Sequence, residues 1–246
     1  DEILYVIGNG FDIHHGIDSR YTDFKNWLQR KKRDSRLTTL MDIFFSNESD
    51  FWSDIETALG EYRKDDITAY CEPENPADFK YNHPGQWQAG VEDSISYVFG
   101  SAMDDFRSYF NHWVMSIDIE GSEPDMQLSK DSRYLTFNYT DTLETIYGIP
   151  PKNVLHIHGN RLMPDSEFII GHGNHQNADD PYGDDGILLP YQNAYSEVIS
   201  IMNQWTKDCM SIIEKNKEFF LSLNTCHAVK VMGYSYNEID MPYIKE

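Results

Sequence analysis

The sequence predicts an α/β protein with a parallel sheet covered by helices. Short apolar runs rich in Val, Ile, Leu or aromatic residues alternate with longer amphipathic stretches. Continuous apolar runs are typical of strands buried on both faces of a parallel sheet. A glycine-rich turn follows the first run, and polar residues follow later ones. At 246 residues the chain has room for one large domain, or for a domain with an insertion.

Five segments have the length and composition of buried strands. They are Ile3–Ile7, Arg133–Phe137, Asn153–Ile157, Glu167–Ile170 and Ala228–Met232. In an open parallel sheet, ligands bind beyond the carboxyl ends of the strands. The residues that directly follow these segments are therefore the candidates for a functional site.

Helical periodicity fills the stretch between the first two strands, where apolar residues recur at steps of three and four. The helical segments are Thr22–Arg30, Leu37–Phe45, Phe51–Tyr62 and Gln86–Ile117. A second long helical pattern, Tyr191 to Leu223, separates the last two strands. We predict an α/β nucleotide-binding domain from residues 1–24 and 125–246, with residues 25–124 as a helical insertion after the first strand.

Composition and charge exclude several classes of protein. A formal net charge of −21 repels phosphate backbones, so we expect no binding to nucleic acid or to an anionic membrane. No apolar run approaches the roughly 18 residues of a membrane span, and no export signal is recognisable. The three cysteines, Cys71, Cys209 and Cys226, are scattered, which argues against a disulfide framework or a thiolate zinc site. We expect a soluble cytoplasmic protein.

The first strand ends in Gly8-Asn9-Gly10, followed by Phe11 and Asp12. Glycine lets the backbone adopt positive φ and brings amide groups close to an anion, and a following helix N-terminus favours the same ligand. The turn is therefore a candidate phosphate site. The alternative is that these glycines only make the bend between strand and helix.

Two polar residues, Asn138 and Asp141, follow the second strand. The amide of Asn138 can both donate and accept a hydrogen bond, as contact with a sugar or a water requires. Asp141 can contact a ligand or cap the helix predicted to begin beside it, and the sequence leaves both roles open.

Histidines stand at the ends of two further strands. His156 and His158 point to the same face if the strand alternates regularly, and one of them then faces the site. The alternative is a pair of packed, hydrogen-bonded rings. Together with His172 and His175, which follow the next segment, these residues make a zinc-dependent hydrolase a further hypothesis. Asp12 or Asp141 would then be the carboxylate ligand. No recognised zinc spacing is present, so we expect no metal.

These segments together resemble a known family. Gly8-Asn-Gly-Phe-Asp-Ile-His-His-Gly-Ile17, Phe137-Asn-Tyr-Thr-Asp-Thr-Leu-Glu144 and His156-Ile-His-Gly159 are similar to motifs of the bacterial AbiH abortive-infection proteins. Tyr21–Phe24 and the closing segment Met232–Asp240 also resemble that family. The resemblance spans nearly the whole chain and implies a role in antiphage defence.

AbiH motifs are in turn similar, more remotely, to those of sirtuin-like domains. The first glycine turn, the following Gly-Ile and Asp-Phe pairs, the Asn with Asp close behind, and the His-Gly pair match in order. This resemblance implies a Rossmann-like (sirtuin-like) fold that binds nicotinamide adenine dinucleotide (NAD). The NAD-binding residues that it implies are Gly8, Asn9, Gly10, Asp12, Gly16, Tyr21, Asp23, Gly233 and Ser235.

Deacetylating sirtuins carry a four-cysteine zinc module, which this chain lacks, so the resemblance favours NAD hydrolysis over protein deacylation. Cleavage of the nicotinamide–ribose bond passes through an oxocarbenium-like state. Asn138 would hold the water or the ribose hydroxyls, His158 would accept a proton, and Asp141 would orient or polarise. The amides of Gly8 and Gly10 would hold the pyrophosphate. The dehydrogenase fingerprint is unmatched, because Gly16 is the next glycine after Gly10.

Three functions thus remain in play: an NAD-cleaving enzyme, a nucleotide-binding sensor or interaction module in which His158 is structural, and a metal-dependent hydrolase. The expected partner is a small-molecule nucleotide. Control by homo-oligomerisation or by a phage-derived activator is compatible with a toxic activity, but no segment of the sequence defines an interface.

Overall fold

The structure is a computed structural model and describes residues 2–31, 35–45, 50–75, 78–163, 168–179 and 191–246. The chain forms two compact units. The α/β unit comprises Asp1–Trp27, Phe110–Ile170 and Lys207–Glu246. The helical unit comprises Leu28–Tyr109 and Gly171–Thr206.

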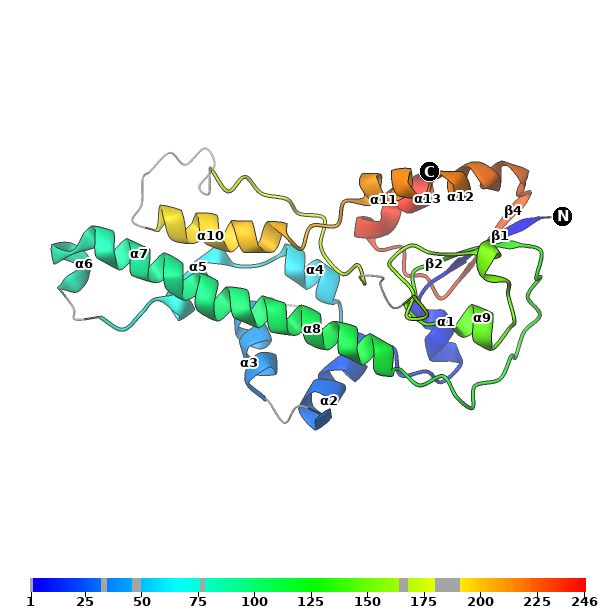
Figure 1. Cartoon of the computed structure of the whole chain (residues 1–246), viewed down its shortest axis with the longest axis horizontal. Coiled ribbons are helices and arrows are strands. Elements are labelled where there is room, and N and C mark those ends of the chain that lie inside the picture. Colours follow the sequence, from blue (N-terminus) through cyan, green and yellow to red (C-terminus); the bar gives the residue numbers. More distant parts are fainter. Residues whose placement is uncertain (1, 32–34, 46–49, 76–77, 164–167, 180–190) are drawn as a thin grey trace. The chain divides into compact units, whose positions relative to one another are not determined.

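A four-stranded parallel sheet forms the centre of the α/β unit (Figure 1). Its strands are β1 (Ile3–Ile7), β2 (Arg133–Thr136), β3 (Val154–His156) and β4 (Ala228–Met232), in the order β3-β2-β1-β4. Val6 of β1 lies opposite Leu135 on one side and Val231 on the other. The predicted mixed α/β class and parallel sheet are confirmed, and four of the five predicted strands form within two residues of the expected bounds.

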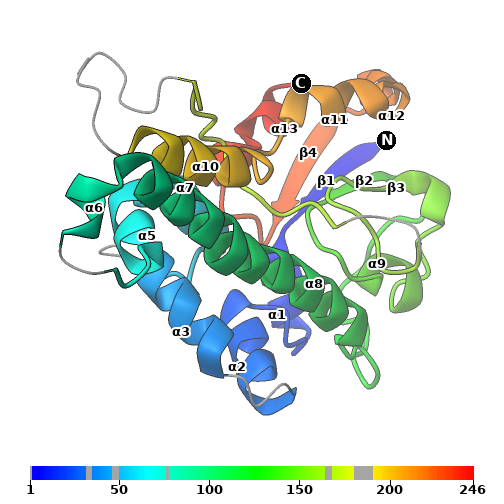
Figure 2. The same ribbon diagram turned by 60° about the vertical axis from the view of Figure 1, so that its left-hand side comes forward.

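Helices cover both faces of this sheet (Figure 2). Leu4 and Val6 face one side, where they pack in a cluster with residues of α11 (Cys209–Lys215), α12 (Lys217–Ser222) and α13 (Met241–Lys245). Tyr5 and Ile7 face the other side and pack with α1 (Asn9–His14) and α9 (Thr142–Thr145). Successive strand residues point to opposite faces, so β1 contributes to both clusters.

The edge strand β4 departs from the expectation of burial on both faces. Val229 is 62% exposed and Val231 is 40% exposed. β4 pairs with β1 on one side only among the described strands. The apolar composition of a strand therefore did not distinguish a central position in the sheet from an edge position.

The predicted strand Glu167–Ile170 does not form. Glu167 lies outside the described residues, and Phe168–Ile170 has no strand conformation. The amide of Ile169 donates to the carbonyl of His158 at 2.9 Å, and the Tyr139 hydroxyl donates to the carbonyl of Ile169 at 2.8 Å. A loop carbonyl and a side-chain hydroxyl thus satisfy the backbone amide and carbonyl of Ile169, so these groups do not need a neighbouring strand as partner.

The helical unit is built from amphipathic segments of the predicted insertion together with α10. Its elements include α3 (Ser35–Phe44), α4 (Ile55–Gly60), α5 (Lys64–Cys71), α6 (Phe79–Asn82), α7 (Pro84–Ile95) and α10 (Gln192–Asn203). A single π-helical turn, Ser96–Gly100, joins α7 to α8 (Ser101–Ser116), and α2 spans Tyr21–Lys31. The long helix predicted over Gln86–Ile117 is thus present, with a π-bulge inside it.

The units divide the chain at other residues than the predicted domains. Gly171–Thr206 belongs to the helical unit, because α10 packs against α5 and α7. The predicted helix from Tyr191 to Leu223 accordingly breaks after α10, and α11 and α12 belong to the α/β unit. Three-residue 3₁₀ turns occur at Pro151–Asn153, Leu223–Thr225 and Glu238–Asp240.

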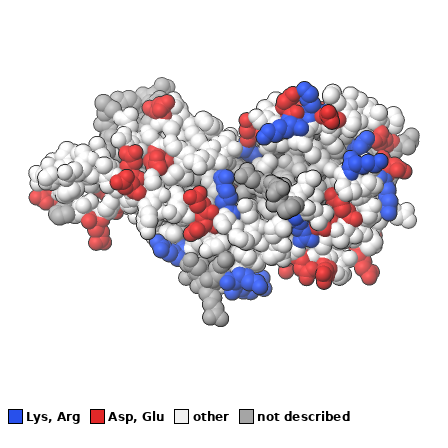
Figure 3. Space-filling view, viewed as in Figure 1, with Lys and Arg blue, Asp and Glu red and all other residues white. Residues whose placement is uncertain are grey.

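None of the helices in the described ranges is long and apolar enough to cross a membrane. On the face drawn in Figure 3, acidic side chains are dispersed rather than gathered into one patch, and basic side chains lie among them. The excess of negative charge in the composition is therefore spread out on this face.

Candidate functional site

The glycine turn after β1 packs directly against the loop after β4. The Gly8 amide donates to the carbonyl of Met232 at 3.0 Å, and the Gly10 amide donates to the carbonyl of Gly233 at 2.9 Å. Gly233 has φ of +65°, and a Cβ on it would lie 2.2 Å from the nitrogen of Phe11. These glycines therefore allow two backbone segments to touch where side chains would not fit.

This contact alters the predicted role of the turn. The Gly8 and Gly10 amides already have carbonyl acceptors, so their geometry does not provide the anion cradle expected from the sequence. The helix α1 that follows has only six residues. The alternative hypothesis, that glycine is required for the backbone geometry of the turn, accounts for Gly8 and Gly10 and also explains Gly233.

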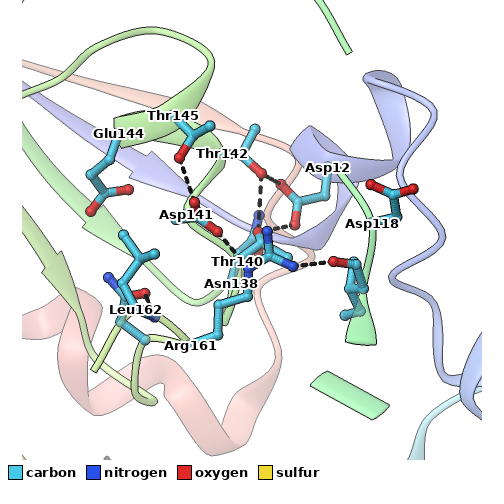
Figure 4. A network of polar contacts seen from close by, with 12 residues as sticks. Asp12, Asp118, Asn138, Thr140, Asp141, Thr142, Glu144, Thr145, Arg161 and Leu162 are labelled. Carbon is cyan, nitrogen blue, oxygen red and sulfur yellow. Dashed lines mark hydrogen bonds and ion pairs between the residues drawn. The ribbon is translucent and has the colours of Figure 1, made fainter. Parts of the chain in front are cut away.

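A buried carboxylate, Asp12, lies just beyond the turn and is only 1% exposed. The hydroxyl of Thr140 donates to its Oδ2, and the hydroxyl of Thr142 lies 2.8 Å from its Oδ1 (Figure 4). Asn138 also hydrogen-bonds this carboxyl group with its side chain. The carboxyl ends of β1 and β2 thus bring together Asp12 and three polar side chains, as expected for neighbouring parallel strands.

Burial raises the pKa of Asp12 above its usual value, because the charged form loses its hydration. The hydrogen bonds from Thr140, Thr142 and Asn138, together with the charge of His15, act in the opposite direction but do not outweigh burial. The Asp12 carboxylate is therefore a costly group that the surrounding donors only partly stabilise.

Asn138 is held at nearly all of its polar atoms. Its backbone amide donates to the hydroxyl of Thr136 at 3.1 Å, and its carbonyl accepts from Nδ1 of His156 at 3.0 Å. Its side-chain amide donor faces Asp12. Within the described chain, Oδ1 of Asn138 is buried without a hydrogen-bond partner. A fixed side chain with one remaining acceptor is suited to receive a hydroxyl or water hydrogen.

Asp141 pairs with Arg161 rather than capping a helix. Nε of Arg161 donates to Oδ1 of Asp141 at 2.5 Å, and the Thr145 hydroxyl donates to Oδ2 (Figure 4). Arg161 also donates to the carbonyls of Ile117 and Tyr139. Asp141 stands at the N-cap position of α9, but its side chain makes no capping hydrogen bond. Asp141 therefore ties the segment after β2 to the segment after β3.

The pKa of Asp141 should be visible in the pH dependence of stability. Burial alone would raise this pKa, but hydrogen bonds from Thr145 and Arg161 and the charge of Arg161 hold it below its usual value. A depressed pKa contributes stability above the unfolded value, about 3.9, and this contribution is lost as pH falls through the folded value. We expect Asp141→Asn to cost more stability at neutral pH than at acidic pH, measured by urea unfolding. An equal cost at both pH values would contradict this.

His158 lies in a separate buried cluster. Its Nε2 is 3.3 Å from Oδ1 of Asp240 and 3.4 Å from Nζ of Lys207, and Lys207 lies 3.0 Å from the same Asp240 oxygen. The rings of Phe137, Tyr139 and Tyr243 lie 5.4, 6.4 and 5.8 Å from the His158 ring. No hydrogen bond among the described residues joins His158 to Asn138, although two of these rings flank Asn138 in sequence.

The expectation that His156 and His158 share one face is wrong. Nε2 of His156 pairs with Glu144 of α9 at 2.9 Å. His158 instead contacts Tyr243 of α13, and α9 and α13 pack on opposite faces of the sheet. Strand β3 ends at His156, and a turn begins at Ile157, so the period-two alternation does not extend to His158.

Comparison with known proteins identifies the family. The family model for bacteriophage abortive infection AbiH matches residues 4–246, which includes every site residue described above. The chain belongs to the AbiH family. This confirms the resemblance seen in the sequence and indicates a role in abortive infection by bacteriophage. No curated protein and no solved structure matches this chain.

The other predicted binding residues of this AbiH chain lie around α1 and α2. The side-chain amide of Asn9 donates to the carbonyl of Ser19, and Oδ1 of Asn9 accepts from the Ser19 hydroxyl at 2.6 Å. Asp23 accepts from the Arg20 amide at 2.9 Å. Gly16 has φ of +73°, and Tyr21 begins α2. Asn9 and Asp23 thus order local turns, and Ser235 is exposed.

The four histidines considered for a metal site in this AbiH chain are divided between the two units. His156 and His158 belong to the α/β unit, whereas His172 and His175 belong to the helical unit. Nε2 of His172 is 3.0 Å from the carbonyl of Met202, and burial lowers its pKa. In the described ranges, no group of three or more His, Cys, Asp or Glu residues could hold a metal ion.

Several residues of these clusters were not predicted from the AbiH sequence. Thr140 and Thr142 are the neighbours of Asp141 in the sequence, and a hydroxyl near the end of a strand was the available signal. Lys207 and Asp240 carried no local signal, because a lysine and an aspartate of a loop become informative only when burial is known. Their side chains are 0% and 7% exposed.

Proposed function

We propose that this AbiH protein acts in abortive infection by hydrolysing NAD at the nicotinamide–ribose bond, in a Rossmann-like, sirtuin-like α/β unit. The observation that carries the proposal is the buried side chain of Asn138 at the carboxyl end of β2. Its acceptor Oδ1 has no hydrogen-bond partner among the described residues. Ligands of open parallel sheets bind at this edge.

The chemistry requires polar groups around the ribose. As the bond to nicotinamide breaks, positive charge develops on the sugar, and dipoles that are already oriented stabilise it without reorganisation. Oδ1 of Asn138 would accept a hydrogen from a ribose hydroxyl or from the attacking water. The Asp12 carboxyl group would keep the Asn138 amide in this orientation through its hydrogen bond.

The remaining predicted residues receive roles that fit their contacts. His158 would take the proton from the hydroxyl or water, a task suited to an imidazole near neutral pH. Asp141, paired with Arg161, would orient the loops rather than touch the sugar. Gly8, Gly10 and Gly233 would bring the loops after β1 and β4 together near the adenosine half of NAD, with Ser235 next to them.

Nicotinamide release from NAD by the purified protein, with a chelator present, tests this proposal. We expect turnover by the wild type and a loss of roughly 100-fold or more in both Asn138→Ala and His158→Gln. Asp125→Asn serves as the control, because Asp125 also faces histidines, His14 and His15, but lies outside both clusters. Chelator-sensitive turnover would instead favour the metal-dependent hydrolase. Equal turnover by all four proteins would contradict the assignment of Asn138 and His158.

A second function, a nucleotide-binding sensor, has one observation in its favour. His158 is buried among aromatic rings and two charged side chains, an environment that also suits a structural histidine. A sensor would be stabilised against heat by NAD but would release no nicotinamide. Thermal stabilisation of the wild type without turnover would therefore favour the sensor, and control by an activator or by oligomerisation would then become the next question.

A further inference from the structure

The cluster around His158 contains a buried lysine whose role no local feature explains. The Lys207 side chain is 0% exposed, and that of Asp240 is 7% exposed. Burying two charges is expensive, and an apolar pair would often be at least as stable. We therefore expect this buried ion pair, which contacts a histidine, to have a role beyond stability.

We propose that Asp240 and Lys207 position His158 so that its Nε2 carries the hydrogen and its Nδ1 is the proton acceptor. This inference rests on the proposed function for the catalytic use of His158. The arrangement of the three side chains can be tested without it. Asp240 and Lys207 are positioning residues in this scheme, since they act through His158.

Asp240 determines which nitrogen of His158 carries the hydrogen, because an ionised carboxylate can only accept hydrogen bonds. An unprotonated Nε2 only 3.3 Å from Oδ1 would place two lone pairs against each other. A hydrogen on Nε2 would instead present a donor to that oxygen, and a contact between a donor and an ionised carboxylate is more favourable than one between neutral groups. Burial would raise the pKa of Asp240, but the contact with Nε2 of His158 and the charge of Lys207 hold it below its usual value.

Lys207 stabilises the ionised form of Asp240 in this arrangement. Its ammonium group neutralises Asp240 at 3.0 Å and leaves the carboxylate ionised in a buried setting. Nζ also lies 3.4 Å from Nε2, but an ammonium group has three hydrogens and can direct them elsewhere. Lys207 has contacts beyond those with His158 and Asp240. A carboxylate has no such freedom, so Asp240 rather than Lys207 decides which nitrogen is protonated.

The three aromatic rings fix the plane of the imidazole. Phe137, Tyr139 and Tyr243 surround His158, and the Tyr139 hydroxyl is itself held by the carbonyl of Ile169 at 2.8 Å. His158 therefore has a defined orientation as well as a defined tautomer. A hydroxyl or water that gives up a proton would have to approach Nδ1.

Nitrogen-15 NMR of the imidazoles at about pH 8, where ordinary imidazoles are neutral, tests the arrangement directly. The His158 signals are assigned by their loss in His158→Gln. We expect the Nε2–H tautomer in the wild type and in Lys207→Met, and its loss in Asp240→Asn. Asp125→Asn is the matched control, which should affect His14 and His15 but leave His158 unchanged. An Nδ1–H tautomer in the wild type would overturn the inference.

Asp240→Asn leaves the Lys207 charge without its carboxylate, so the double variant Lys207→Met/Asp240→Asn is measured beside it. Both lack the carboxylate, and both should lose the tautomer. On the kinetic side, we expect kcat for NAD to fall by roughly 10- to 1,000-fold in the double variant while KM changes little. An unchanged kcat in an active enzyme would overturn the positioning role. If the wild type does not cleave NAD, the proposed function is wrong. The tautomer of His158 measured by NMR still tests the arrangement of the three side chains.

Discussion

Replacing Gly233 by alanine is expected to destabilise the α/β unit by about 3 kcal/mol or more. Two costs add at this position. The left-handed conformation, with φ of +65°, costs an alanine about 1–2 kcal/mol. The new Cβ would also lie 2.2 Å from the backbone nitrogen of Phe11 and 2.5 Å from the carbonyl carbon of Gly10. Backbone cannot rotate away as a flexible side chain can, so the loop after β4 must move.

Gly16→Ala is the matched control, because Gly16 has a similar φ of +73° but no atom within 4 Å of an added Cβ. It should cost only the conformational part, about 1–2 kcal/mol. Urea unfolding of both variants separates strain from close approach. Equal losses in the two variants would show that the contact between the loops after β1 and β4 is not as tight as described.

Replacing Asp12 by leucine is expected to cost about 3 kcal/mol near pH 4, because it leaves buried donors without an acceptor. The hydroxyls of Thr140 and Thr142 and the amide of Asn138 all bond this carboxyl group. Thr142→Val, which removes one of these groups, should cost about 1 kcal/mol. A leucine variant as stable as the wild type would contradict the importance of the network.

The pH dependence of the Asp12→Leu cost has a definite sign. The folded pKa of Asp12 is raised by burial. A raised pKa contributes stability below the unfolded value, about 3.9, and the contribution is lost as pH rises through the folded value. The cost of Asp12→Leu should therefore shrink from acidic to neutral pH, which is the opposite of Asp141→Asn. Denaturant unfolding of wild type and variant at several pH values measures this, and a growing cost would contradict it.

The position of each strand and the location of the Asp12 site followed from local sequence. Apolar runs identified β1, β2, β3 and β4, because strand formation in a buried sheet depends on composition over a few residues. The rule that ligands bind at the carboxyl ends of parallel strands then singled out Asn138 and Asp141. Asp12 was named as a residue after the first glycine turn, and the fold brings it next to Asn138. The AbiH motifs were likewise readable in the sequence, since they are runs of consecutive residues.

Periodicity failed where the chain left regular structure. Alternation placed His156 and His158 on one face, but the strand ends between them. Composition also suggested a strand over Glu167–Ile170, whose described part is held by loop contacts.

Other features of the site depended on packing between distant segments. Gly233 meets Gly10, and Lys207 and Asp240 meet His158, only because β4 and the helices around it fold back onto β1 and β3. Such contacts join residues with no fixed spacing, so no local pattern encodes them. The sequence alone therefore determined the sheet, the family and one polar cluster. The tertiary structure decided which backbone amides are occupied and which charged groups surround His158, because burial and partnership are properties of the folded chain.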